Sequence, residues 1–225
     1  PYLIEIAREN CIDGNRVRAG DAVNFSIGQG DTLVTPLRLA EIYAAIANNG
    51  TYYRPQVARA IVDVDGKVLK EFKPEVLDTV KGEQKTWDFL HRALRMVVTR
   101  GTAAGAFSGF PVAVSGKTGT AQVFGKNPNG SAKDDTSWFA SYGPTENPQY
   151  SVVMMVSQGG FGASTSGIGV RDIYATLFGV TGNKVDPTKV VFPNGVPTTI
   201  AKVDLKKAAS EVDLTGIKVG GVKLK

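Results

Sequence analysis

The sequence predicts an α+β fold, an antiparallel β-sheet flanked by helices. Segments with helical spacing of apolar residues come early in the chain, and three strand candidates joined by short links follow them. One more helical segment comes after the strands. Consecutive strands with short links pair antiparallel. Helices that cover such a sheet without alternating with its strands define the α+β class.

The first part of the chain contains two helix candidates. Residues 2–10 have the pattern of the end of a short helix, and a glycine-bearing loop is expected from there to Gly20. Thr35 followed by Pro36 is a strong helix start, because a threonine hydroxyl caps a helix and proline suits its first turn. The helix predicted over residues 36–48 is apolar on most sides, so we expect it to be buried.

A hairpin and a long helix are predicted next. Asp65-Gly66 is a two-residue turn signal between the strand candidates 57–64 and 67–72. Apolar residues then recur at helical spacing, which predicts an amphipathic helix over residues 83–100. The residues that carry this spacing are Trp87, Leu90, Leu94 and Val97.

Three strands and a covering helix complete the predicted fold. The strand candidates span residues 111–124, 136–142 and 150–157, and Gly-Pro and Asn-Pro turn signals separate the last two. Apolar residues between Val170 and Leu177 predict a helix that ends at Gly179.

Composition bounds the domain organisation and the partners. The 225-residue chain is 42% hydrophobic and 21% charged, which is ordinary for a globular protein. We expect residues 1–180 to form one part of a domain and residues 181–225 to form a Lys-rich C-terminal extension. The net charge is +5, and most of the positive excess lies in this extension, which has no Arg. Nucleic-acid-binding surfaces cluster Arg with aromatic residues, so we expect no nucleic-acid partner.

The chain has one cysteine, Cys11, and one histidine, His91. A single cysteine excludes an internal disulfide framework, and these two residues are too few for a structural zinc site. A site made of carboxylates alone stays open, but the spacing of a calcium-binding loop is lacking. We therefore expect no metal and no cofactor. No run of about 18 apolar residues predicts a membrane span.

The most informative segment is Ser115–Thr120, with the sequence Ser-Gly-Lys-Thr-Gly-Thr, on the first predicted strand of the sheet. Its glycines let a substrate backbone approach closely, as an added strand would. Lys117 and the hydroxyls could hold a carboxylate, and a strand N–H could face a developing oxyanion. Taken alone, a Lys-Thr-Gly triplet favours the simpler interpretation of a polar strand end or turn.

The flanks of this triplet resemble those of class B penicillin-binding proteins. Lys-Thr-Gly on a sheet strand is one of the signatures of penicillin-binding proteins and serine β-lactamases. Further segments match the same family in the same order, over about residues 1–179. They are Ser26–Gly30, Thr35–Ala40, Ala47–Gly50, Val97–Ala103 and Ser137–Pro144. Arg18–Asp21 leading into Ser26–Gly30 resembles the elongation-type proteins of actinobacteria. The resemblance implies a β-lactamase/transpeptidase-like fold that is incomplete without residues N-terminal to this chain.

The resemblance also implies roles for the residues of the triplet. Lys117 would supply positive potential as a catalytic residue. Thr118 and Thr120 would bind the carboxylate of a D-Ala-D-Ala stem peptide or of a β-lactam, and the Thr120 N–H would form half of the oxyanion hole. Gly119 would keep the strand accessible, and Ser115 is counted among the substrate-binding residues.

Other conspicuous residues are expected to be structural. A glycine turn that feeds a helix accounts for Gly28, Gln29 and Gly30 without a catalytic role. Core packing is the preferred interpretation for Trp138 and Phe139. His91 lies in the middle of a predicted helix, and no G-x-S-x-G elbow accompanies it, so a Ser-His-Asp triad is not expected.

Two motifs of the family are missing from this sequence. Neither the nucleophile motif S-x-x-K nor the S-x-N motif is present. Both lie N-terminal to Lys-Thr-Gly in the family, so we expect the N-terminal part of the same protein to supply them. The chain alone should not be acylated.

The resemblance implies a peptidoglycan D,D-transpeptidase that uses a serine acyl-enzyme and is acylated by β-lactams. The expected partners are stem peptides, β-lactams and a membrane glycosyltransferase of the wall-elongation machinery. The expected location is the extracytoplasmic face of the bacterial cell membrane, with the anchor outside this chain. A D,D-carboxypeptidase or β-lactamase, and a non-catalytic β-lactam-sensing or scaffold domain, remain as alternatives.

Overall fold

The computed structural model describes residues 8, 19–30, 33–63, 67–191, 218–219 and 222–223. The chain divides into two compact units. Unit 1 comprises Pro1–Tyr52 and Asp78–Phe192, and unit 2 comprises Tyr53–Leu77 and Pro193–Lys225. No helix in the described ranges is long and apolar enough to cross a membrane.

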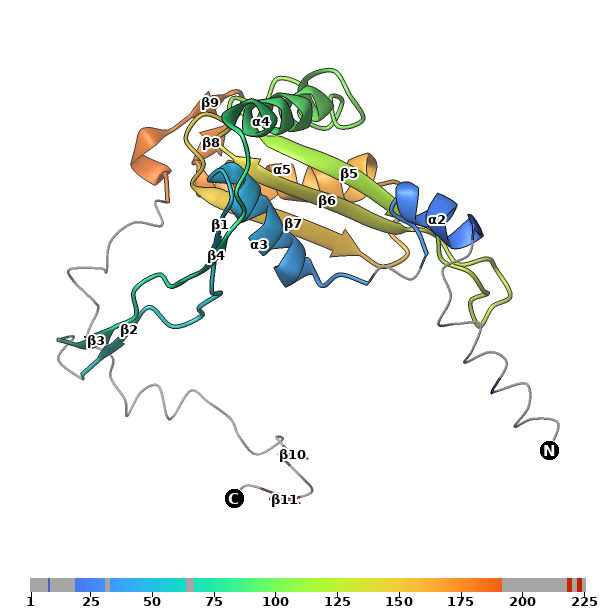
Figure 1. The fold of residues 1–225 in the computed structure, drawn as a ribbon, viewed down its shortest axis with the longest axis horizontal. Helices are drawn as coiled ribbons and strands as arrows, with labels where there is room; N and C mark the ends of the chain where they lie inside the picture. Colours follow the sequence, from blue (N-terminus) through green and yellow to red (C-terminus); the bar gives the residue numbers. More distant parts are fainter. Residues whose placement is uncertain are drawn as a thin grey trace. The chain divides into compact units, whose positions relative to one another are not determined.

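Unit 1 is built on a three-stranded antiparallel sheet (Figure 1). Its strands are β5 (Ser115–Ala121), β6 (Thr136–Gly143) and β7 (Tyr150–Val156), in the order β5-β6-β7. The central strand β6 is the most buried of the three. Among the residues that the structure describes, β5 pairs only with β6 in this sheet, so no described strand covers its other edge.

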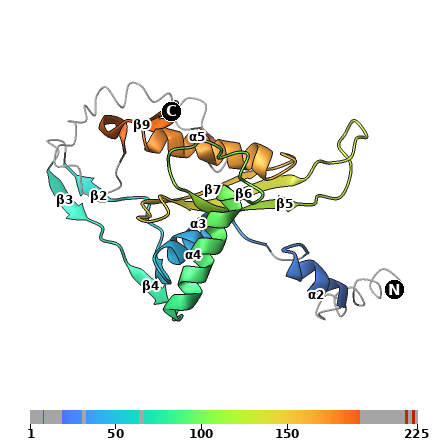
Figure 2. The same cartoon turned by 90° about the horizontal axis from the view of Figure 1, so that it is seen from above.

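Helices cover both faces of this sheet. Figure 2 shows α3 (Pro36–Ala47) and α4 (Gln84–Thr99) on one face and α5 (Ile168–Leu177) on the other. A short π-helical turn, η1 (Ala163–Gly167), leads into α5. The Thr35 hydroxyl caps α3 by accepting the Arg38 N–H at 3.1 Å, as the sequence predicts.

The core of unit 1 lies between the sheet and α5. Fully buried residues come from β6, from α5 and from the segment that joins α4 to β5. The buried members of this cluster are Val98, Ala103, Phe107, Val112, Val114, Phe139, Val170, Tyr174 and Phe178. Buried serines satisfy one another here, since the Ser137 hydroxyl donates to the Ser166 hydroxyl at 2.8 Å.

Shorter elements complete the described chain. Helix α2 precedes α3, strands β1 and β4 pair, and β8 pairs with β9 ahead of a 3₁₀ turn, η2. Strands β10 and β11 pair antiparallel near the end of the chain. The bounds are Ala19–Ser26 for α2, Thr51–Tyr53 for β1, Val76–Thr79 for β4, Val180–Thr181 for β8, Lys184–Val185 for β9, Pro187–Lys189 for η2, Lys218–Val219 for β10 and Val222–Lys223 for β11.

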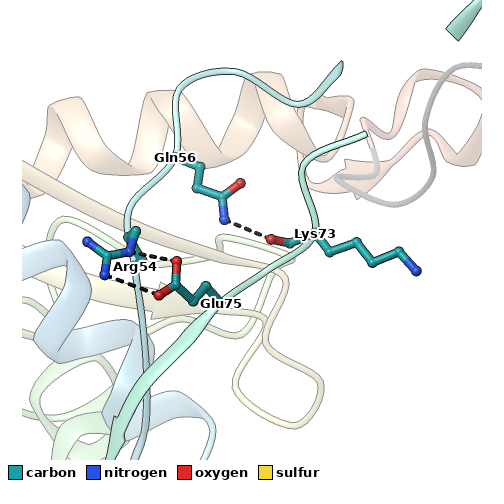
Figure 3. Close-up of polar contacts among 4 residues, drawn as sticks. All are labelled: Arg54, Gln56, Lys73 and Glu75. Atoms are coloured by element: carbon teal, nitrogen blue, oxygen red, sulfur yellow. Dashed lines mark hydrogen bonds and ion pairs between the residues drawn. The ribbon is translucent and has the colours of Figure 1, made fainter. Parts of the chain in front are cut away.

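Unit 2 contains the hairpin formed by β2 (Ala60–Val62) and β3 (Val68–Glu71). Figure 3 shows the polar contacts at its base. The Arg54 guanidinium donates to both oxygens of Glu75, at 2.7 and 3.1 Å, and this pairing lowers the pKa of Glu75. The Gln56 amide donates to the Lys73 carbonyl at 2.8 Å.

The α+β class with an antiparallel sheet is confirmed, and so are the three sheet strands, the hairpin strands and the helices α3, α4 and α5. The expected burial of α3 is wrong. Only Ala45 of this helix is buried, and Leu37 is 61% exposed. Helix α2 is not predicted from the sequence, and it begins inside the expected loop.

Some expectations lie outside the described residues. Among them are the helix end over residues 2–10, apart from Arg8, and the Asp65-Gly66 turn. The division at residue 180 stays a prediction. Up to Val191 the chain is still part of unit 1, where Val180 and Val190 pack against its core.

Gly162 provides a test of the packing between the η1 segment and the sheet. A Cβ at this position would lie 2.4 Å from the Gly119 carbonyl oxygen and 2.8 Å from the Trp138 carbonyl oxygen. We expect Gly162→Ala to lower the free energy of unfolding by about 1–3 kcal/mol through overpacking. Gly105→Ala is the matched control, because a Cβ there meets nothing within 4 Å. Thermal unfolding of both variants measures the difference, and equal stability would contradict this packing.

Candidate active site

The register of β5 against β6 decides where each side chain of the triplet points. Lys117 lies opposite Ala140, and Thr118 lies opposite Phe139. Successive side chains of a strand alternate between faces. Phe139 belongs to the core beneath α5. Thr118 and Thr120 therefore share the α5 face of the sheet, whereas Lys117 and Gly119 share the α3 face.

The open edge of β5 between Lys117 and Thr120, called the β5 edge below, presents backbone groups to the outside. The Thr120 carbonyl accepts from Gln29 Nε2 at 3.3 Å, and the Thr118 carbonyl accepts from Lys117 Nζ at 2.9 Å. In an antiparallel ladder the N–H and C=O of one residue point to the same side. The N–H groups of Thr118 and Thr120 are therefore also directed to the open edge.

Both threonine hydroxyls beside the β5 edge have a partner behind them. The Gly162 N–H donates to Thr120 Oγ1 at 3.1 Å. The hydroxyls of Thr102 and Thr118 lie 2.7 Å apart, and either can be the donor. An amide N–H only donates, so the Thr120 hydroxyl keeps its own proton free to point outward.

An open groove of about 690 Å³ runs along the β5 edge and over the α3 face of the sheet. The strand supplies a cation, hydroxyls and glycine, whereas the other walls are largely apolar. Those walls include Leu33, Val34, Leu39, Tyr43, Trp138 and Met155. Such a mixture of an apolar lining and a few convergent polar groups is typical of ligand sites.

Ser115 does not line this groove. It is fully buried at the start of β5, and its hydroxyl lies 2.9 Å from that of Thr145. Nearby, Tyr142 is hydrogen-bonded to His91 Nδ1 at 2.7 Å, and His91 Nε2 lies 3.0 Å from Asn49 Oδ1. His91 thus joins β6 to the end of α3, as a structural role for it predicts.

Two residues that matter for the site were not assigned to it from the sequence. The sequence predicts only a structural turn for Gln29, yet its amide contacts the Thr120 carbonyl and it lines the groove. Thr102 lies in the segment Val97–Ala103 that resembles the family, with no individual role predicted for it, yet its hydroxyl contacts that of Thr118. Phe139 is a core residue as expected, whereas Trp138 lies in the wall of the groove.

The β5 edge can bind an extended, anionic ligand. An incoming backbone can pair with an exposed strand edge as an added strand. The Lys117 ammonium and the threonine hydroxyls can hold a carboxylate. The outward Thr120 N–H can stabilise negative charge that develops on a carbonyl oxygen.

Comparison with known proteins identifies the family. Residues 10–175 match the penicillin-binding protein transpeptidase domain. The chain belongs to this family. The peptidoglycan D,D-transpeptidase MrdA of Haemophilus influenzae is 33% identical over 159 residues, which cover 65% of this chain and 24% of that protein. Class B relatives such as this one confirm the class that the sequence resembles.

Solved structures of the family have the same fold. The chain matches Pseudomonas aeruginosa PBP2 in complex with WCK 5153 with a TM-score of 0.64, 27% identity and coverage of 80% of this chain and 38% of that one. It matches the imipenem acyl-enzyme complex of penicillin-binding protein A from M. tuberculosis with a TM-score of 0.57, 26% identity and coverage of 68% and 33%.

A third match has a title that describes structural coordination of polymerization and crosslinking by a peptidoglycan synthase complex. Its TM-score is 0.62 at 30% identity, with coverage of 76% of this chain and 28% of that one. The chain therefore spans only about a quarter to two fifths of the length of these four family members.

Tyr43 in the groove makes stability depend on pH at the alkaline end. Burial, and secondly the nearby Tyr142, raise the pKa of Tyr43 from 10.0 to about 12. A raised pKa means that the folded state holds the proton more tightly, so this stabilisation is complete below pH 10 and is lost as pH rises toward 12.

Between pH 10 and pH 12, ionisation of Tyr43 should lower the unfolding free energy of the wild type by roughly 1–2 kcal/mol, a figure reduced for the partial exposure of Tyr43. In Tyr43→Phe we expect this part of the decrease to be absent. Denaturant unfolding at a series of pH values measures it. Tyr53→Phe, at an exposed tyrosine, serves as the matched control. Identical pH profiles for wild type and Tyr43→Phe would show that Tyr43 does not carry this dependence.

Proposed function

We propose that the β5 edge is the substrate-binding wall of a serine-type peptidoglycan D,D-transpeptidase. One observation carries the proposal. At a single open strand edge, a lysine, two outward N–H groups and two threonine hydroxyls converge. Membership of the transpeptidase family and the D,D-transpeptidase name of the MrdA relative support it.

The residues of the edge have distinct roles in this proposal. Thr118 and Thr120 donate to the terminal carboxylate of a D-Ala-D-Ala stem peptide, or to that of a β-lactam. The Thr120 N–H stabilises the oxyanion, and Lys117 supplies positive potential to the same place. Gly119 has no side chain to obstruct an incoming strand. Ser115 is buried, so its role in this proposal is to hold the start of β5 through Thr145, and not to contact the substrate directly.

The reaction requires a nucleophilic serine from another part of the protein, since no S-x-x-K motif occurs in this sequence. The serine oxygen attacks the carbonyl carbon between the two D-Ala residues, and the C–N bond breaks. D-Ala leaves with a proton on its amine, and an ester remains. The amine of a neighbouring stem peptide then attacks this ester, forms the cross-linking amide and returns the proton to the serine.

Partners and location follow from the same proposal. A membrane glycosyltransferase of the wall-elongation machinery fits the match to a peptidoglycan synthase complex. The site would face the cell wall from the extracytoplasmic side of the bacterial membrane, held by an anchor elsewhere in the protein. The elongation-type, actinobacterial-like subgroup remains part of the proposal.

Acylation tests the proposal directly. Full-length protein is mixed with a fluorescent penicillin, and the rate of covalent labelling is measured for wild type and Lys117→Ala. We expect wild type to be labelled and Lys117→Ala to be labelled on the order of 10²-fold more slowly, because the oxyanion loses its nearby cation. Lys133→Ala is the matched control, since it removes the same charge from the exposed β5–β6 loop.

The outcome separates the alternatives. A wild-type protein that is not labelled contradicts an acylating enzyme and leaves a non-acylating scaffold. A labelled protein is then given a stem-peptide donor with and without an amine acceptor. Cross-linked product identifies a transpeptidase, whereas hydrolysis alone identifies a D,D-carboxypeptidase or a β-lactamase. A protein that forms a stable acyl-enzyme but gives neither cross-linked nor hydrolysed product is identified as a β-lactam sensor.

A further inference from the structure

Thr102 lies outside the Lys-Thr-Gly triplet but touches it. Its hydroxyl oxygen is 2.7 Å from that of Thr118, which is within hydrogen-bond distance. We propose that Thr102 is a positioning residue that turns the Thr118 hydroxyl into a donor toward the substrate carboxylate. This inference rests on the proposed function, and it assigns the β5 edge a residue from the turn that follows α4.

The direction of the Thr102–Thr118 hydrogen bond decides what Thr118 can bind. A hydroxyl has one proton to donate, and an ionised carboxylate only accepts. If Thr118 gives its proton to Thr102, it meets the carboxylate with lone pairs alone. If Thr102 is the donor, the proton of Thr118 is free for the carboxylate. Carboxylate binding therefore selects a relay that runs from Thr102 through Thr118 to the ligand.

Thr120 shows the fixed form of the same arrangement. Its oxygen accepts from the Gly162 N–H, and a backbone amide cannot reverse the direction of that bond. In both cases the threonine oxygen accepts a hydrogen bond and its own proton can go to the ligand, but the donor behind it differs. The Gly162 N–H can only donate, so the hydroxyl proton of Thr120 is always free for a ligand. The Thr102 hydroxyl can donate or accept, so the proton of Thr118 is free only when a bound acceptor selects that direction. Hydrogen bonds in such a chain polarise and strengthen one another.

The turn around Thr102 is fixed by its neighbours in the chain. The Ala103 N–H donates to the Val97 carbonyl at 3.1 Å, and Ala103 is fully buried. A Cβ on Gly101 would lie 2.7 Å from Val97 Cα, so glycine allows the close turn. The backbone of Thr102 is thus held between Gly101, which has no room for a Cβ, and the buried Ala103, while the side chain of Thr102 is exposed. Its hydroxyl therefore approaches Thr118 without the entropy cost of ordering a long side chain.

The test uses full-length protein and a fluorescent penicillin in two forms, the free carboxylate and its methyl ester. Thr102→Val removes the hydroxyl and keeps the shape of the side chain. We expect acylation by the carboxylate form to slow about tenfold, because Thr118 loses its donor, while acylation by the ester changes little. Thr102→Ser restores the hydroxyl and should restore the preference for the carboxylate.

Two further variants isolate the relay. In a Thr118→Val background, Thr102→Val should cause no additional loss, since the residue that it positions is gone. Thr99→Val is the matched control. Its hydroxyl bonds only to carbonyls of its own helix α4, so acylation by both forms should stay at the wild-type rate. If Thr102→Val does not fold, as judged by its thermal unfolding, Thr102→Ala replaces it.

Two results overturn the inference while leaving the proposed function intact. One is a Thr102→Val protein with the wild-type preference for the carboxylate. The other is an equal loss with the acid and the ester, which marks a purely structural residue. A wild-type protein that no penicillin labels overturns the proposed function, and this inference with it.

Discussion

The pairing of β5 with β6 on one side only is the constraint on which the rest of the site depends. Strand β6 is central and fixed by fully buried residues, including Phe139 and Tyr142. It imposes its register on β5 over the whole length of that strand. The same ladder that stabilises unit 1 therefore sets which backbone groups of Lys117–Thr120 face outward. The site needs no separate framework, because it is the unpaired side of a paired strand.

The two faces of the sheet supply different chemistry to this edge. The α3 face carries the lysine and the apolar groove, whereas the α5 face carries the two threonine hydroxyls. Segments at the ends of two helices support these hydroxyls from behind. Thr102 follows α4, and Gly162 precedes η1 and α5. Helix packing on the sheet thereby controls side-chain hydrogen bonds at the edge.

Much of the fold could be predicted from local patterns. Helical spacing predicts α4 and α5, the Thr35-Pro36 start predicts α3, and short links between apolar segments predict the antiparallel sheet. The burial of α3 could not be predicted in this way. The apolar residues of α3 predict that the helix is buried against other elements. Within the described residues, however, the sheet covers only part of the surface of α3.

The triplet itself could be identified from its sequence and its flanks, whereas the contacts that support it could not. Gln29 contacts Thr120 across 91 positions, Gly162 contacts it across 42, and Thr102 contacts Thr118 across 16. Helical and strand periodicity describe neighbours within one element. These contacts join different elements through turns, so only the packed structure determines them.

An ordinary edge strand offers donors and acceptors in equal number, which makes it a template for any other strand. The β5 edge differs because Gln29 and Lys117 donate to its two outward carbonyls. What remains directed outward are N–H groups, a cation and hydroxyl protons. An edge with its acceptors occupied and its donors free favours ligands rich in acceptor oxygens, such as a carboxylate beside a carbonyl. An incoming backbone that pairs with this edge therefore meets free N–H groups, whereas each outward carbonyl already accepts one hydrogen bond from the chain itself. The preference for an acceptor-rich ligand end that the proposed function requires thus follows from which backbone groups of β5 the chain itself has already satisfied.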